Sequence, residues 1–359
     1  MRVFFILFQV LVWFIAAISP RRKKATELRF SAGAKGWELL AINEIYLSAS
    51  EWLSPEKVTK VVYRESLSVR DELGACSHFF YDAGTGYDQS KSGLKRKLSC
   101  YFRALKICLV GALRGITVIG FISDFGNRNL RVAGFIATAG EGHIVTSTSP
   151  RAVPPRFLLH KRISGPTLMP FSVKTVESIN GNQWQDRERL ISFVGTPYGV
   201  RANFLQEISE ACAEAGLEFS VFGRAGPTGE RVSNGEYWRI HTNSTFTIAL
   251  NFPQPAATGE IVDFPEVENL VGRVTEAVVA GCCLLSDMPA GIERLLRPHE
   301  HFVPIETPDD VIEVLLDYSK RPEFYETIAR SGRLQAEALA GTAFFWNSLN
   351  TALGKHAMF

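Results

Sequence analysis

Short apolar runs alternate with amphipathic stretches along most of the chain. In the first half, four apolar runs predict buried strands at residues 58–63, 78–81, 116–122 and 143–148. Between the last two, residues 130–139 have the apolar spacing of a helix. Strands that alternate with helices are typical of βαβ units, which form a parallel sheet covered by helices. The pattern therefore predicts an α/β domain.

A second series of the same kind follows a polar stretch. Residues 174–186 are rich in Ser, Asn, Gly and Gln and predict a linker. After this stretch we expect strands at 190–194, 218–222, 245–250 and 282–286, and helices at 201–215, 274–280, 309–318 and 322–340. The chain is therefore expected to form one domain at 25–172 and another at 173–340, with 341–359 packing back toward the first.

The first apolar run of the chain has three interpretations. Residues 3–18 are apolar except for Gln9, and a basic cluster follows at 21–24. As a helix this run would be about 24 Å long, slightly short of a hydrocarbon core of about 30 Å. The basic cluster favours a membrane anchor at 1–24 with the rest of the chain on the cytoplasmic side. The alternatives are a first buried strand at 2–7 and a cleaved signal peptide.

Residues 94–114 predict a basic amphipathic helix. The residues expected on its apolar face are Leu94, Leu98, Tyr101, Phe102, Leu105, Cys108, Leu109, Ala112 and Leu113. The basic residues expected on the remaining surface are Lys95, Arg96, Lys97, Arg103, Lys106 and Arg114. Such a helix can lie in a membrane interface, but the strand predicted directly after it favours packing on the sheet of its own domain.

Composition excludes several classes of protein. The chain has 359 residues, of which 46% are hydrophobic and 21% charged, so a disordered or collagen-like chain is excluded. The six cysteines have neither the spacing of zinc ligands nor that of a small disulfide-rich domain, which favours a reducing compartment.

The charges are distributed unevenly between the two halves. Residues 1–180 contain 25 Lys and Arg against 13 Asp and Glu, a balance of +12, and the remaining residues contain 14 against 24, a balance of −10. A basic half suits an anionic membrane surface. No recognised nucleic-acid-binding motif accompanies this charge, so nucleic acid is not expected as a partner.

Two glycine-containing turns follow predicted strands in the second half. After the strand at 190–194, the loop begins with Gly195 and leads to Arg201, so that amide groups and a guanidinium could contact a phosphate. After the strand at 218–222, Gly223 and Arg224 suit a loop beside a base or a ribose. Either turn alone is also compatible with an ordinary strand–helix connection.

The most specific motif consists of two glutamates separated by seven residues. Glu268 precedes a predicted apolar helix and Glu276 lies in its early turns. The backbone amides of Leu270 and Gly272 lie between the two glutamates and could bind a phosphate at the helix N-terminus. Carboxylates can bind the paired hydroxyls of a ribose or a hexose. The alternative is a solvated pair in which Glu276 forms an ion pair with Arg273.

This stretch resembles the E-x7-E element of group 1 glycosyltransferases with the GT-B fold. Arg273, Glu276 and the following Gly281 are especially similar to the CgeB-like branch, and the resemblance covers about residues 188–340. It implies an α/β protein of the GT-B class, with two Rossmann-like domains facing each other across a cleft. The first domain would bind the acceptor and the second the nucleotide-sugar donor.

The resemblance also implies roles for individual residues. Glu276 would bind the donor ribose, and Glu268 the transferred sugar or its diphosphate side. Arg201 and Arg273 would neutralise the diphosphate. Gly195, Gly223, Arg224, Leu270 and Gly272 complete the expected donor site. In the first domain, Asp124, His143 and His78 are candidates for acid–base chemistry, although a helix cap or a core histidine is the ordinary alternative for each. No metal or other cofactor is expected.

These observations predict a metal-independent, retaining glycosyltransferase of the hexosyltransferase kind. Its donor would be a nucleotide-diphosphate sugar, and its acceptor a glycan or a lipid-linked glycan at the cytoplasmic face of a membrane, in polysaccharide or glycoconjugate biosynthesis. One alternative is another nucleotide-binding α/β enzyme, although no strand is followed by the GxGxxG pattern of dehydrogenases. The other is a non-catalytic, membrane-tethered protein with a transferase-like fold.

Overall fold

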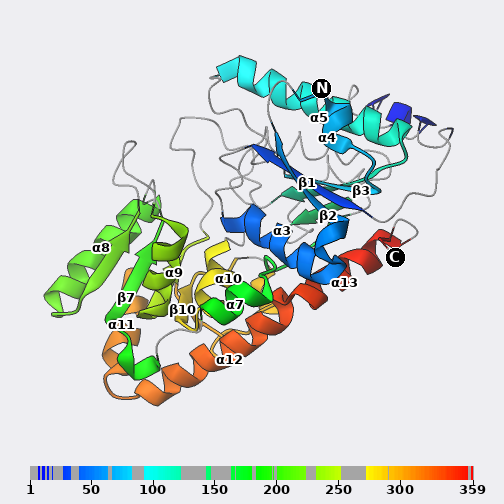
Figure 1. The fold of residues 1–359 in the computed structure, drawn as a ribbon. Helices are drawn as coiled ribbons and strands as arrows, with labels where there is room; N and C mark the ends of the chain where they lie inside the picture. Colours follow the sequence, from blue (N-terminus) through cyan, green and yellow to red (C-terminus); the bar gives the residue numbers. More distant parts are fainter. Residues whose placement is uncertain are drawn as a thin grey trace. The chain divides into compact units, whose positions relative to one another are not determined.

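In the computed structural model, the chain divides into two units that each contain a parallel sheet (Figure 1). The first unit comprises Met1–Ser172 and Thr342–Phe359, and the second comprises Val173–Gly341. The residues described by the structure are 7, 8, 10–12, 14, 15, 18, 27–33, 40–63, 67–82, 93–122, 143–146, 163–165, 167–179, 183–195, 197, 200–223, 232–251, 272–289, 291–354, 357 and 358. The helix predicted at 130–139 lies outside these residues.

The sheet of the first unit has six described strands in the order β2-β1-β3-β4-β5-β6, all parallel. They are β1 (Leu28–Gly33), β2 (Val58–Tyr63), β3 (His78–Asp82), β4 (Thr117–Ile122), β5 (His143–Thr146) and β6 (Ile163–Ser164). The strand order reverses at β1, which pairs with β2 on one side and β3 on the other.

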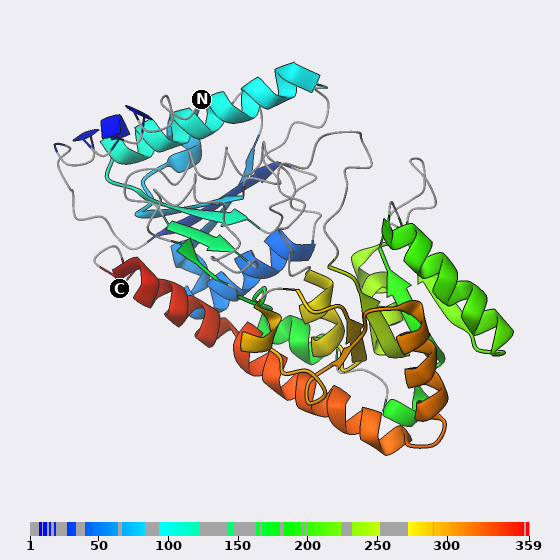
Figure 2. The same ribbon diagram turned by 180° about the vertical axis from the view of Figure 1, so that it is seen from behind.

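Helices cover both faces of this sheet (Figures 1 and 2). Helices α3 (Leu40–Leu53) and α13 (Thr342–Leu353) lie on one face, and α4 (Val69–Leu73) and α5 (Gly93–Leu113) lie on the other. Helix α13 inserts Trp346, which is fully buried, against the rings of Phe30 and Phe80. The indole of Trp346 donates a hydrogen bond to Ser48 of α3 at 3.0 Å. The last described helix of the chain therefore contributes to the core of the first unit.

A buried ion pair lies between the sheet and α5. Arg103 of α5 contacts the carboxylate of Glu72, which also accepts a hydrogen bond from Ser31 of β1. The guanidinium of Arg103 lies over the ring of Tyr81, 5.5 Å from its centroid. Both charged side chains are buried, because each charge is compensated by the other.

This ion pair corrects the predicted orientation of α5. From the sequence, Arg103 is expected on the basic surface, and Phe102 and Leu113 are expected on the apolar face. In the structure Arg103 is buried, while Phe102 and Leu113 are 59% and 57% exposed. The residues of α5 that pack toward the sheet include Ala104, Ile107 and Cys108. The helix does cover its own sheet, but it is rotated relative to the expected position because Glu72 compensates an arginine in the core.

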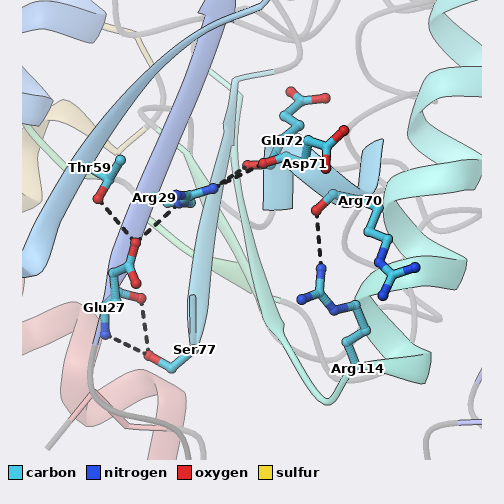
Figure 3. Close-up of polar contacts among 8 residues, drawn as sticks. All are labelled: Glu27, Arg29, Thr59, Arg70, Asp71, Glu72, Ser77 and Arg114. Atoms are coloured by element: carbon cyan, nitrogen blue, oxygen red, sulfur yellow. Dashed lines mark hydrogen bonds and ion pairs between the residues drawn. The ribbon is translucent and has the colours of Figure 1, made fainter. Parts of the chain in front are cut away.

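A second polar network connects the strands at their amino ends (Figure 3). Arg29 and Thr59 donate to the carboxylate of Glu27 at 3.1 and 3.0 Å, and the backbone amide of Glu27 donates to Ser77. Arg29 also donates to the carbonyl oxygen of Asp71 in α4 at 3.0 Å. These contacts join β1, β2, the start of β3 and α4, which indicates a structural role at this edge of the sheet.

The sheet of the second unit has five described strands in the order β11-β10-β9-β7-β8, again parallel. They are β7 (Arg189–Val194), β8 (Phe219–Phe222), β9 (Ser244–Ala249), β10 (Cys283–Ser286) and β11 (Val303–Pro304). The helices are α7 (Val173–Ser178), α8 (Val200–Glu214), α9 (Asn234–Thr242), α10 (Gly272–Val279), α11 (Pro308–Tyr318) and α12 (Pro322–Ala340). The strand order reverses at β7, which pairs with β8 and β9.

Two sequence predictions need correction at the ends of these units. The stretch predicted as a linker at 174–186 largely forms α7 and a 3-10 turn at Trp184–Asp186. The first described strand is β1, and Leu7, the one described residue of the strand proposed at 2–7, is helical. The described residues from Leu7 to Ile18 are all helical. Among the parts of the chain that the structure describes, no helix is both long enough and apolar enough to span a bilayer.

Candidate functional site

The segments that form the candidate site lie where the strands of the second sheet end. Gly195 follows β7, Leu250 follows β9, and Gly272 begins α10. The carboxyl ends of parallel strands lie at one edge of the sheet, and ligands of open α/β sheets bind where the strand order reverses. In this sheet the reversal lies between β7 and β9.

Arg273 of α10 reaches back to the end of β7. Its Nη1 donates to the carbonyl oxygen of Val194 at 3.0 Å, and its guanidinium lies over the ring of Phe193, 4.9 Å from the centroid. Gly195 has a φ of 147°. A Cβ atom at Gly195 would lie 2.5 Å from Nη1 of Arg273. Both the backbone conformation and the close guanidinium therefore require glycine here.

We expect Gly195→Ala to lower the free energy of unfolding by about 1–3 kcal/mol and to weaken nucleotide binding, because the new methyl group displaces Arg273. Gly216→Ala is the matched control. Gly216 has a φ of 69°, but its added Cβ would have no neighbour within 4 Å. Denaturant melts and titration with nucleoside diphosphates would separate the two effects. Equal nucleotide affinity in wild type and Gly195→Ala would contradict a role for this turn in binding.

Arg201 provides a second cation at the same edge. It is the second residue of α8, its side chain is buried, and its Nη2 donates to the carbonyl oxygen of Leu250 at 2.8 Å. The start of α8 is thereby joined to the end of β9. Arg201 and Arg273 therefore flank the two central strands of the sheet at their carboxyl ends.

Glu276 is oriented by a tyrosine that the sequence analysis did not single out. The hydroxyl of Tyr237 in α9 donates to Oε2 of Glu276, and Glu276 as a whole residue is only 8% exposed. A Cβ atom at Gly272 would lie 3.3 Å from Oε1, so the carboxylate folds back over the first residue of α10. A negative charge near the N-terminus of a helix is stabilised by the helix dipole.

A buried histidine, His241, packs against Tyr237, the partner of Glu276. The ring of His241 contacts that of Tyr237 at a centroid distance of 4.6 Å, and its Nδ1 lies 3.4 Å from Thr247 Oγ1. Burial, with a contribution from the charge of Arg273, lowers the pKa of His241 to about 3. His241 is therefore neutral near pH 7.

The lowered pKa of His241 predicts a loss of stability in mild acid. Between pH 6.5 and pH 3 the unfolded chain binds a proton at this residue that the folded chain does not, so the free energy of unfolding decreases as the pH falls. From pH 7 to pH 5, wild type should lose about 2 kcal/mol more than His241→Gln. Denaturant melts at the two pH values provide the measurement. Equal losses would show that the pKa of His241 is not lowered in the folded protein.

Asn251 and Asp287 form a polar pair at the ends of β9 and β10. The amide side chain of Asn251 donates to Ser286 Oγ at 3.0 Å and to Asp287 Oδ1 at 2.8 Å. The backbone amide of Asn251 also donates to Asp287 Oδ1, at 2.7 Å. This pair was not predicted from the sequence, although a polar residue directly follows each of two predicted strands and was the available signal.

Four of the other predicted site residues lie outside the described residues: Glu268, Leu270, Arg224 and Asp124. Gly223 directly follows β8, as expected. His143 and His78 are the first residues of β5 and β3, and both are buried. They therefore lie at the amino ends of their strands, away from the edge where ligands of such sheets bind.

Within the described ranges, no group of three or more His, Cys, Asp or Glu side chains has an arrangement that could hold a metal ion.

Comparison with known proteins agrees with the fold. Residues 201–341, which include Arg201, Arg273 and Glu276, match the family model described as glycosyl transferase-like. The comparison with curated proteins gives no match.

Three solved structures have a similar fold at low sequence identity. An alpha-glucosyltransferase in complex with UDP-glucose and DNA containing an abasic site has a TM-score of 0.60 and 10% identity, covering 90% of this chain and 98% of that chain. Anabaena Alr3699/HepE in complex with UDP has a TM-score of 0.51 and 11% identity, covering 93% and 100%. An alpha1,3-fucosyltransferase has a TM-score of 0.50 and 10% identity, covering 98% of both chains. The predicted fold class, α/β with two Rossmann-like domains of the GT-B type, is confirmed.

Proposed function

We propose that this chain is a glycosyltransferase that uses a nucleotide-diphosphate sugar as donor. The observation that carries the proposal is the arrangement of Arg201, Arg273 and Glu276 at the carboxyl edge of the second sheet, where the strand order reverses. The match of residues 201–341 to a glycosyl transferase-like model supports it independently.

In this proposal, two cations and one carboxylate have different tasks. Glu276 accepts hydrogen bonds from the ribose hydroxyls of the donor, while Tyr237 holds its other oxygen. Arg273, Arg201 and the amides at the start of α10 stabilise the negative charge that develops on the departing diphosphate. Such oriented donors are worth about 3–4 kcal/mol each in the transition state. Because these protein groups neutralise the diphosphate, the proposal includes no metal ion.

The donor base is proposed to be uracil and the transferred sugar a hexose. The alpha-glucosyltransferase and HepE, which share the fold, were solved with UDP-glucose and UDP respectively. We further propose that the configuration at the anomeric carbon is retained, which nuclear magnetic resonance of the first product formed would test directly. An inverted anomeric configuration would remove this part of the proposal alone.

The acceptor is proposed to be a glycan or a lipid-linked glycan at the cytoplasmic face of a membrane. Residues 1–180 contain 25 basic and 13 acidic residues, and this positive balance supports an anionic surface as the binding partner of the first domain. One relative by fold was solved with DNA, so duplex DNA belongs in the acceptor assay as a separate arm. Transfer to DNA would overturn this choice of acceptor.

Ligand-induced stabilisation tests the donor proposal. Full-length protein is melted with UDP, GDP, ADP and their sugars, and release of free nucleotide is then measured. A ligand at about 100 times its dissociation constant should add about 2.7 kcal/mol to the free energy of unfolding. Stabilisation by UDP and slow release of UDP from UDP-glucose are expected. Binding without any release, with every acceptor tested, would favour a non-catalytic protein with this fold.

A further inference from the structure

The N-terminal segment, meaning the described residues from Leu7 to Ile18, is held by the first unit. Its side chains Phe8 and Val12 are buried and belong to a core cluster that includes Phe79 of β3 and Ile107 of α5. Residues four apart lie on one face of a helix. One face of this segment therefore forms part of the hydrophobic core beneath α5.

The opposite face of the same segment is apolar and exposed. Five large side chains on it are between 49% and 66% exposed: Leu7, Val10, Leu11, Phe14 and Ile18. Their spacing of three and four residues places them together on one side of the helix. A contiguous exposed apolar surface of this kind marks an interaction site.

Helix α5 extends this surface. Both views show the N-terminal segment beside the carboxyl-terminal part of α5, on the side of the sheet that α5 covers (Figures 1 and 2). Phe102 and Leu113 of α5 are exposed, and the exposed Lys106 lies one turn beyond Phe102. We call the exposed residues of the N-terminal segment, together with Phe102, Lys106 and Leu113, the docking face.

The two elements of the docking face carry charges of one sign in their sequence. Neither residues 1–26 nor helix α5 contains an Asp or Glu, whereas the sequence has four consecutive basic residues at 21–24 and, besides the buried Arg103, five Lys or Arg at 94–114. An anionic lipid surface complements both the apolar and the basic residues. A symmetric contact between two copies would instead bring like charges together.

We propose that the docking face binds an anionic lipid bilayer and that the N-terminal segment lies flat in the interface. A spanning arrangement would remove Phe8 and Val12 from the core, whereas a flat one keeps them buried and covers the exposed side chains with lipid. This inference does not depend on the proposed enzymatic function, because it rests on residues of the first unit alone.

The test measures binding of full-length protein to vesicles of phosphatidylcholine, alone or with about one third phosphatidylglycerol. Wild type should sediment with the anionic vesicles and be released by high salt. Phe102→Glu and Phe14→Glu should each reduce the partition coefficient at least about tenfold, because each places a carboxylate in the interface. Phe344→Glu is the matched control, since Phe344 is also exposed but belongs to α13 on the opposite face of the sheet.

Each outcome decides for or against the proposal. Loss of binding in Phe102→Glu and Phe14→Glu, with normal binding in Phe344→Glu and unchanged circular dichroism in all three, supports it. If wild type does not bind anionic vesicles at low salt, the proposal is overturned. An equal loss of vesicle binding in Phe344→Glu overturns it as well. A dimer in sedimentation that Phe102→Glu converts to a monomer, without vesicle binding, would assign the face to a second copy of the chain.

Discussion

Glu276→Gln is expected to weaken binding of the nucleotide-sugar donor by about a hundredfold. The substitution keeps the size of the side chain and an oxygen that can accept from Tyr237, but it removes the charge that would bind the ribose hydroxyls. A hydrogen bond to a charged group contributes up to about 3 kcal/mol. This energy corresponds to about a hundredfold in the dissociation constant. Calorimetric titration with UDP and with UDP-glucose provides the measurement.

Two variants serve as controls for this substitution. Glu326→Gln makes the same chemical change on α12, where Glu326 forms a helical ion pair with Arg330, and it should bind UDP normally. Tyr237→Phe removes only the hydroxyl that orients Glu276, so we expect a loss of about tenfold. Normal UDP affinity in Glu276→Gln, with a folded protein, would exclude Glu276 from the donor site.

The second large effect concerns the buried ion pair of the first unit. Glu72→Ala should lower the free energy of unfolding by about 3–5 kcal/mol, because it removes the carboxylate that Arg103 contacts inside the core. Urea melts of wild type and variant provide the measurement. The second unit has its own core, so its melting should change less than that of the first.

A double variant separates the effect of charge from that of packing. Glu72→Leu/Arg103→Met replaces both charges with apolar side chains of similar length, and it should be more stable than Glu72→Ala. If Glu72→Ala lowers the free energy of unfolding by less than about 1 kcal/mol, Glu72 and Arg103 do not form a desolvated ion pair in solution.

Strands and helices with a simple apolar pattern were predicted accurately. The strand at 58–63 and the helix at 322–340 have the predicted bounds in the structure, since β2 is Val58–Tyr63 and α12 is Pro322–Ala340. In β9 and β10 every side chain is buried, as expected for interior strands of a parallel sheet. Their polar residues are Ser and Thr alone, so no charged residue obscured the pattern of either strand.

Strand β1 was not predicted, because the partners of its two polar residues are not visible in the local pattern. Arg29 contacts Glu27 and the backbone of Asp71, and Ser31 donates to Glu72. The buried position of Arg103 escaped prediction for the same reason. Glu27 is close to Arg29 in the sequence, but Asp71 and Glu72 lie 31 or more residues from the residues that they contact, and a local pattern contains no information about such distant partners.

The candidate site was predicted only in part. Gly195, Arg273 and Glu276 were found because each belongs to a local motif at the end of a strand or the start of a helix. Tyr237 was not found, because its contact with Glu276 depends on how α9 packs against α10, 39 residues away. His143 is the first residue of its strand, both in the prediction and in the structure, and this position already placed it at the amino end of the sheet.

A crystal structure of the protein with UDP would test the central claim most directly. We expect the diphosphate at the N-terminus of α10, beside Gly195 and within hydrogen-bonding distance of Arg273 or Arg201, and the ribose hydroxyls on the carboxylate of Glu276. A nucleotide bound elsewhere on the chain, with Glu276 still in contact only with protein, would contradict the proposed donor site.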